Sequence, residues 1–113
     1  MCTLSDLNDI LSFLKAEYQK TYSDTLVRLY LYGSYARGDY TDNSDIDIVA
    51  IVKGERKNLQ NKLKDIWDFS ANMELDYNVI ISPSVIPYDE FERYKEILPY
   101  YKNIAQEGVD FLA

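Results

Sequence analysis

Histidine is absent from this sequence of 113 residues, and cysteine occurs once, at Cys2. Without histidine the chain cannot form the Ser-His or Cys-His pairs that activate a nucleophile. A single thiol allows neither an internal disulfide nor a zinc site built from thiolates. Any acid–base or metal chemistry must therefore depend on carboxylates, tyrosines or lysines.

Basic residues are scarce as well, with 12 Lys and Arg against 19 Asp and Glu, a formal charge of -7. Since nucleic-acid binding relies mostly on a basic surface that displaces counterions from phosphates, we expect no nucleic-acid partner. No apolar run approaches the roughly 18 residues of a membrane span. The first residues, MCTLSDLNDI, also lack the basic flank and apolar run of a signal peptide. We therefore expect a cytoplasmic protein without membrane association.

What is present is the composition of a globular protein, 47% hydrophobic and 27% charged. This composition and length predict one domain, residues 1–113, with a core of its own. The 11 tyrosines are the unusual feature. Many fall in apolar-patterned segments, where they can serve the core, an interface with a partner, or self-association.

Hydrophobic periodicity predicts helices and strands in the order α-β-α-β-α-β-α, an α/β fold in which helices pack on a small sheet. We expect helices at 4–22, around Leu59–Trp67, at 89–96 and from Pro99 to Gly108, a short helical turn at 34–37, and strands at 27–32, 45–52 and 75–81. In the second long helix, Leu59, Leu63, Ile66 and Trp67 form the expected buried stripe. The third strand is expected to stop at Pro83.

Residues 33–47, GSYARGDYTDNSDID, carry the chemistry. Gly33 ends a predicted strand, and a glycine there lets the backbone approach a phosphate while Ser34 adds a hydroxyl donor. Asp45 and Asp47 alternate with isoleucines, so both carboxylates project from one face of a strand. Such a pair suits a hard divalent cation, since Mg²⁺ typically takes one or two carboxylates together with substrate phosphates. Taken separately, the Gly-Ser pair also suits an ordinary turn, and the two aspartates also suit a solvated edge strand.

The joint order of strand, Gly-Ser, short helix, Arg-Gly turn and acidic pair resembles the minimal nucleotidyltransferases of the DNA polymerase β superfamily. That family's signature is Gly-Ser, about ten residues, then Asp-x-Asp, here Gly33, Ser34, Asp45 and Asp47. Arg37 and Gly38 match its GS-x-A-R-G run, and the C-terminal part from YNVIISPS to the final EGVDFL is similar too. The resemblance implies the polymerase β-like fold over nearly the whole chain.

The resemblance also implies the chemistry of the site. Two Mg²⁺ ions would hold the triphosphate of ATP or another nucleoside triphosphate, with Asp45 and Asp47 as metal ligands. Gly33 and Ser34 would hold the β- and γ-phosphates. Arg37 would add a positive charge near them, or form a structural salt bridge instead.

The family places a third carboxylate on the next strand, and alignment of the run before Ser82 puts it at Asn78. Asparagine carries no charge and is no useful base. Asp76 would lie two residues earlier on the same face of an extended strand, about 6.5–7 Å away, and Glu74 would continue that face. Asp76 therefore either replaces the missing acid as a catalytic residue or is solvated at the start of the strand.

These features lead to two main functional hypotheses, beside the plainer one of an obligate oligomeric scaffold whose site is unused. In the first, the protein transfers AMP or another nucleotide to a protein hydroxyl, because small members of this family are frequently the antitoxins of helical HEPN-type toxins, which they modify on tyrosine. In the second, the departure at Asn78 marks a catalytically degenerate antitoxin-like module that neutralises its partner by occupancy. The many tyrosines favour an interface in either case.

Overall fold

Four strands form one mixed sheet in the order β3-β2-β1-β4 in the computed structural model, which describes residues 3–112. The strands are β1 (Leu26–Tyr32), β2 (Asp45–Val52), β3 (Ile80–Pro87) and β4 (Val109–Asp110). β1 runs antiparallel to β2 and to β4, whereas β2 and β3 are parallel. Parallel neighbours need a long crossover, and helix α3 (Arg56–Tyr77) supplies it.

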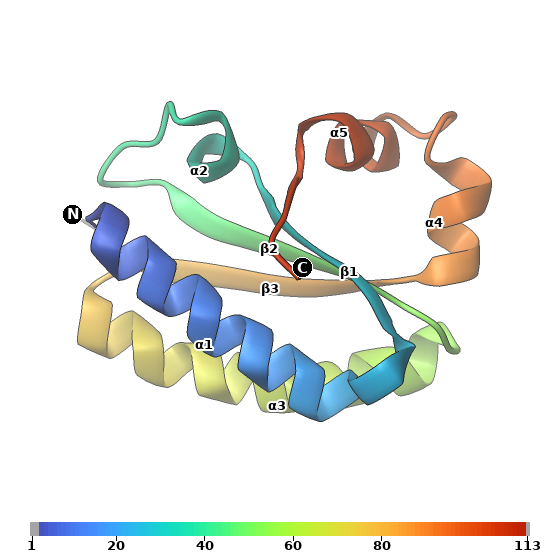
Figure 1. Ribbon diagram of the computed structural model, residues 1–113, viewed down its shortest axis with the longest axis horizontal. Coiled ribbons are helices and arrows are strands. Elements are labelled where there is room, and N and C mark those ends of the chain that lie inside the picture. Colours follow the sequence, from blue (N-terminus) through green and yellow to red (C-terminus); the bar gives the residue numbers. More distant parts are fainter. Residues whose placement is uncertain (1–2, 113) are drawn as a thin grey trace.

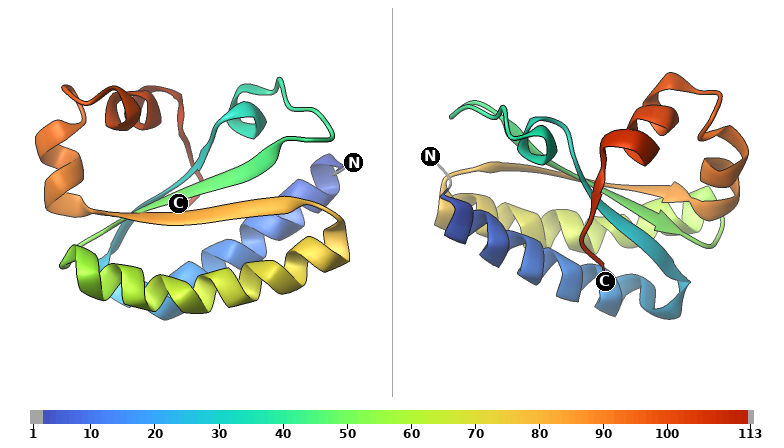
Figure 2. Two further views of the ribbon diagram at one scale, coloured as in Figure 1. Left: turned by 180° about the vertical axis from the view of Figure 1, so that it is seen from behind. Right: turned by 45° about the horizontal axis from the view of Figure 1, so that its top comes forward.

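The helices lie on both faces of this sheet. α1 (Leu4–Tyr22) and α3 run side by side under one face, and α2 (Ser34–Arg37), α4 (Tyr88–Tyr94) and α5 (Pro99–Glu107) lie over the other (Figures 1 and 2). A short 3₁₀ turn, η1 (Ser23–Thr25), joins α1 to β1. The predicted α/β fold, a small mixed sheet packed by helices, is confirmed. None of the helices within residues 3–112 is long and apolar enough to cross a membrane.

Strand β2 divides its side chains between two apolar clusters. Ile46 and Ile48 are buried among the residues of α1 and α3, whereas Val49 and Ile51 pack with α4 and α5. Because side chains alternate along a strand, Asp45 and Asp47 lie on the face of Val49 and Ile51. The prediction that both carboxylates share one face, away from the isoleucines that follow each of them, is confirmed.

Long-range hydrogen bonds connect α1 to strand β3 and to helix α3. The Tyr18 hydroxyl of α1 donates to the carbonyl of Ser84 at 3.0 Å, and that of Tyr22 donates to the carbonyl of Leu59 at 2.7 Å. Both rings are buried, so these hydroxyls need such acceptors. At least these two tyrosines therefore serve the core, one of the roles that the sequence left open.

The boundary between α3 and β3 is where the sequence prediction is wrong. Residues 75–77 are the last turn of α3 and not a strand, and Asn78 ends the helix in the left-handed conformation, with a φ of 53°. The strand then begins at Ile80 and continues through Pro83 to Pro87. Proline is tolerated because β3 is an edge strand, where an N–H can be missing without loss of a ladder bond.

Two smaller differences from the sequence prediction concern Trp67 and the strand β4. Trp67 is 49% exposed, so it does not belong to the buried stripe of α3. The short strand β4 was not predicted, because two residues carry no periodicity. The helical turn at 34–37 and the strand at 45–52 have the predicted bounds, and the last helix runs from Pro99 as expected. Cys2, on which the thiol argument rests, lies outside the described residues.

Candidate active site

Asp45 and Asp47 lie at the start of the central strand β2, between both of its neighbours. Asp47 is opposite Tyr32, the last residue of β1, and opposite Ser82 of β3. Asp45 is opposite Ile80. The carboxylates therefore project at the end of the sheet where β1 turns into α2.

The Gly33 turn packs directly against Asp47. Gly33 precedes α2 with a φ of 78°, and its carbonyl accepts from the N–H groups of Ala36 and Arg37 at 3.1 Å each. A Cβ placed on Gly33 would lie 2.6 Å from Oδ2 of Asp47. Only glycine allows this approach, so the sequence pair Gly33 and Asp47 is one structural unit.

The loop between α2 and β2 is anchored by two aromatic rings. Tyr35 is buried, and its ring stacks on that of Tyr40 with centroids 4.3 Å apart and an interplanar angle of 7°. This stacking returns the chain from the Gly33 turn to the start of β2. The ten-residue spacing of the motif is therefore filled by a folded loop.

Burial, followed by the negative charge of Asp45, raises the pKa of Asp47. Like charges on one strand face disfavour each other's ionisation unless a cation or a proton lies between them. The pair therefore offers a favourable position for a positive charge.

A cavity of about 240 Å³ opens beside Asp47, between the sheet and α5. Its lining comprises Tyr32, Asp47, Ile48, Val49, Ser82, Pro83, Ser84 and Tyr100. The rings of Tyr32 and Tyr100 meet edge to face with centroids 5.9 Å apart. Sequence reasoning missed Tyr32, Ser82 and Tyr100. Tyr32 directly precedes Gly33, which was a usable signal, whereas Tyr100 reaches the cavity only through the packing of α5.

Arg37 forms an exposed ion pair with Asp39, Nε to Oδ2 3.3 Å. This pair is the structural alternative that the sequence left open for Arg37. An exposed pair of this kind contributes little to stability, so the guanidinium remains available to another anion.

Asp76, Asn78 and Glu74 do not lie where the sequence predicted, because none of them belongs to a strand. Asp76 faces a hollow beside Phe13 and Phe69, on the side of the sheet covered by α1 and α3. The Glu74 carboxylate accepts from the N–H of Ile81 at 3.0 Å. The structure therefore does not bring Asp76 to Asp45 and Asp47.

The neighbour of Asp47 on β3 is instead a serine. Ser82 occupies the paired position, so this strand supplies a hydroxyl where a third carboxylate was expected. Among residues 3–112, no three acidic, histidine or cysteine side chains gather closely enough to hold a metal ion by themselves. Asp45 and Asp47 by themselves leave most of the coordination positions of Mg²⁺ to other oxygen atoms, such as those of phosphates and water.

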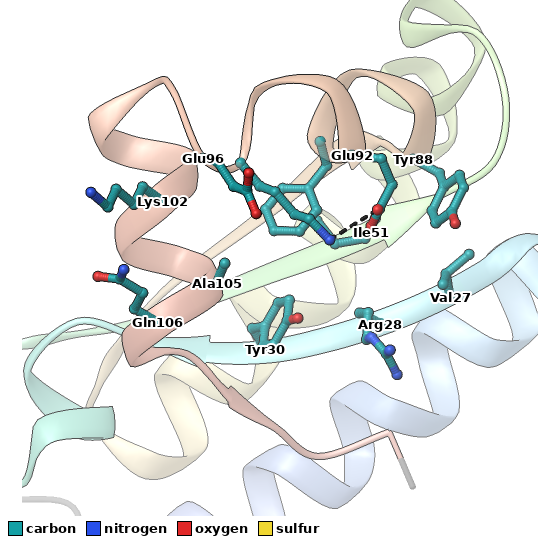
Figure 3. A pocket seen from close by; sticks show the side chains of 12 residues that line it. Val27, Arg28, Tyr30, Ile51, Tyr88, Glu92, Glu96, Lys102, Ala105 and Gln106 are labelled. Carbon is teal, nitrogen blue, oxygen red and sulfur yellow. Dashed lines mark hydrogen bonds and ion pairs between the residues drawn. The ribbon is translucent and has the colours of Figure 1, made fainter.

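A larger cavity of about 480 Å³ lies between β1, α4 and α5 (Figure 3). Its walls carry Arg28, Glu92, Lys95 and Lys102, and Lys95 forms an ion pair with Glu92 at 2.9 Å. None of the residues predicted for the site lines it. We therefore place the candidate active site at Asp47.

The fold and the site together define a nucleotidyltransferase. The chain belongs to the nucleotidyltransferase domain family, whose model matches residues 7–111. This assignment confirms the resemblance on which the sequence interpretation rested.

Two relatives of this chain come from one organism, Methanocaldococcus jannaschii. The chain is 34% identical over 96 residues to "Putative protein adenylyltransferase MJ0141" of Methanocaldococcus jannaschii, covering 79% of this chain and 95% of the relative. It is 28% identical over 102 residues to "Putative protein adenylyltransferase MJ0604" of the same organism, covering 90% of both chains.

A crystal structure of the toxin-antitoxin MntA-HpeT shares the fold. The TM-score is 0.51 at 18% sequence identity, and the match covers 93% of this chain and 70% of the other. At this identity the likeness supports the fold assignment alone.

Proposed function

We propose that this domain transfers a nucleoside monophosphate, AMP from ATP, to a hydroxyl group of a protein. The observation that carries the proposal is the contact between the Gly33 turn and the Asp47 carboxylate, with Asp45 on the same face of β2. This arrangement puts a glycine turn suited to phosphates next to a position suited to a cation. The relatives named as protein adenylyltransferases support the choice of a protein acceptor.

Asp45 and Asp47 are the residues that would hold Mg²⁺, and two carboxylates fit its habit of taking its other ligands from phosphates and water. Bound there, Mg²⁺ supplies positive charge to the triphosphate and stabilises the entering and leaving oxygens of the displacement. Burial and then the charge of Asp45 raise the pKa of Asp47, so a cation between the two carboxylates would relieve their repulsion.

The chain's own residues bind and orient the nucleotide. Gly33 leaves room for phosphate oxygens close to the backbone, and the Ser34 hydroxyl donates to them. Arg37, whose pair with Asp39 is exposed, would add a positive charge near the triphosphate. The acceptor hydroxyl would enter the cavity beside Asp47, because this is the space next to the proposed metal ligands. Ser82 and two tyrosines form its walls.

The acceptor we propose is a protein partner of the HEPN toxin type, with this chain as its antitoxin. This choice follows from the resemblance to the small antitoxins of HEPN-type toxins, and the structure that shares the fold is named as one of a toxin-antitoxin pair.

Labelled ATP, Mg²⁺ and the protein encoded next to this gene would test the proposal. We expect label to pass to that protein, and to fail to do so with Asp45→Asn or Asp47→Asn. Unchanged transfer by these variants would overturn the assignment of the site. Asp68→Asn, an exposed change on α3, is a matched control for the loss of one carboxylate.

A second candidate is a binding module that neutralises its partner by occupancy. Ser82 opposite Asp47 favours it, since a hydroxyl in that place weakens metal binding. Under this alternative, Asp45→Asn and Asp47→Asn still neutralise the partner. Loss of neutralisation by a variant that folds and still binds the partner would exclude it.

A further inference from the structure

Tyr100 brings a phenol hydroxyl into the same cavity as Asp47. Its side chain is 50% exposed and lines the cavity together with the Asp47 carboxylate. Burial of the ring raises the pKa of Tyr100, and electrostatic interactions with Tyr32 and then Asp47 raise it further. The hydroxyl end of Tyr100 therefore lies within electrostatic reach of Asp47.

Helix α5, which carries Tyr100, is held firmly over the sheet. Pro99 starts the helix, and Ile104 on its inner side is completely buried. At its end, Gly108 packs so closely on the ring of Tyr30 that a Cβ would lie 2.9 Å from a ring carbon. These contacts hold α5 on the sheet, and Tyr100 in its first turn is half-exposed and lines the cavity.

The next residue on the helix provides a contrast. The Tyr101 hydroxyl donates to the Glu90 carboxylate, which also pairs with Arg56. Tyr101 does not line the cavity beside Asp47. Of two adjacent tyrosines, one hydroxyl thus belongs to the candidate site and the other is committed to an ion-pair network.

We propose that Tyr100 is a self-modification site, at which the domain places a nucleoside monophosphate on its own chain. The inference rests on the proposed function, because it uses the same nucleoside triphosphate and the same carboxylates. The Tyr100 oxygen forms a bond to the α-phosphorus, the bond from that phosphorus to the bridging oxygen breaks, and pyrophosphate leaves with the electron pair. The phenol proton passes to solvent through the open cavity.

Such a modification would occupy the cavity that receives the acceptor. A cavity of about 240 Å³ beside Asp47 cannot hold both the modified Tyr100 and an incoming side chain. Self-modification would therefore lower the rate of transfer to the partner.

The experiment incubates the full chain with ATP and Mg²⁺ in the absence of any partner, followed by tryptic digestion and mass spectrometry. Cleavage after Lys95 and Lys102 releases residues 96–102, which contain both tyrosines. We expect a mass gain of one nucleoside monophosphate on this peptide, placed at Tyr100 by fragmentation. Tyr101→Phe keeps the modification, whereas Tyr100→Phe and Asp47→Asn lose it.

The outcomes separate this inference from the proposed function. Wild-type protein that labels its partner but never residues 96–102 overturns the self-modification and leaves the transfer activity standing. Protein that labels neither itself nor the partner overturns both. Modification at Tyr32 or Tyr101 instead of Tyr100 also contradicts the inference. A mixture of isotope-labelled Asp47→Asn protein with unlabelled wild-type protein must leave the Asp47→Asn protein without the nucleotide, since Tyr100 and Asp47 of one chain line the same cavity.

Discussion

Gly33 and Asp47 are 14 positions apart in the chain, yet only the missing side chain of Gly33 leaves room for the carboxylate of Asp47. A Cβ on Gly33 would be 2.6 Å from Oδ2 of Asp47, well inside the distance that two such atoms tolerate. A side chain at position 33 would therefore require the Asp47 carboxylate to move.

Gly33→Ala tests this relationship. The residue has a φ of 78° and a ψ of -152°, a conformation that costs a non-glycine residue about 1–3 kcal/mol. The added Cβ also displaces the Asp47 carboxylate. We expect a lower free energy of unfolding and loss of nucleotide transfer, measured by urea denaturation and by label incorporation.

Gly38→Ala is the matched control for strain without a clash. Gly38 has a φ of 85°, but no atom lies within 4 Å of a Cβ placed there. The left-handed conformation alone costs about 1–2 kcal/mol, so stability should fall while transfer is kept. Equal losses of activity in both variants would show that strain, not the contact with Asp47, is responsible.

Asp47→Asn and Asp76→Asn should behave differently. Asp47 lies at the Gly33 turn, whereas Asp76 lies on α3 beside Phe13 and Phe69. Loss of a group that only supports a metal ligand costs roughly 10–100-fold, so removing a ligand itself should lower the transfer rate by more than about 100-fold. Asp76→Asn should leave the transfer rate close to that of the wild-type protein, because Asp76 lies on the other side of the sheet. A large loss in Asp76→Asn would instead restore the role expected from the sequence.

Asp45→Asn should stabilise the protein in metal-free buffer near neutral pH. Burial and Asp45 raise the pKa of Asp47, so the ionised Asp47 opposes folding at pH values above that pKa. Removing the charge of Asp45 relieves part of this cost and raises the melting temperature. The gain should shrink as the pH falls through the pKa of Asp47, where its carboxyl becomes neutral.

Mg²⁺ with ATP should reverse the order of the two melting temperatures. The wild-type protein gains stability from a ligand that binds the folded state, and Asp45→Asn, with one carboxylate fewer, gains less. Circular dichroism during heating with and without Mg²⁺ and ATP measures both effects. A shift by Mg²⁺ and ATP of the same size in both proteins would argue against Asp45 as a metal ligand.

Tyr22 should make the protein sensitive to alkali. Burial, followed by the charge of Asp65, raises the pKa of Tyr22 from 10.0 to about 12. The stability contributed by the protonated phenol is complete below the unfolded pKa of 10.0 and is lost as the pH rises toward 12. We expect Tyr22→Phe to reduce the decline in unfolding free energy between about pH 8 and about pH 11 by about 1 kcal/mol.

Near neutral pH the same variant should be the less stable protein. It loses the hydrogen bond to the carbonyl of Leu59, which is worth about 1 kcal/mol. Urea denaturation near neutral pH and at about pH 11 compares the unfolding free energies of the wild-type and Tyr22→Phe proteins. Phe13→Leu, a change of a partly exposed residue on the same helix, is the control. An identical decline with pH in wild-type and Tyr22→Phe protein would contradict the prediction.

The error at α3 and β3 shows where local patterns stop being informative. The run Leu75, Asp76, Tyr77 alternates apolar and polar residues, and this alternation predicts a strand. In the structure Leu75 is 84% exposed, while Met73 and Tyr77 pack on the core. Packing against α1 extends the helix to Tyr77, and only tertiary contacts could reveal this.

The sequence by itself determined the motif and its chemistry class. Gly33, Ser34, Asp45 and Asp47 could be located because strand alternation and the conformational freedom of glycine are local properties. Together with the order of the strands and the Arg-Gly turn around them, these residues resemble the nucleotidyltransferase family, and the family model confirms that resemblance.

The tertiary structure alone decided which side chains complete the site. It placed Ser82 opposite Asp47, moved Asp76 to the other side of the sheet and brought Tyr100 into the cavity. The parallel register of β2 and β3 and the packing of α5 set these positions. Both depend on contacts between residues far apart in the chain, which no local pattern encodes.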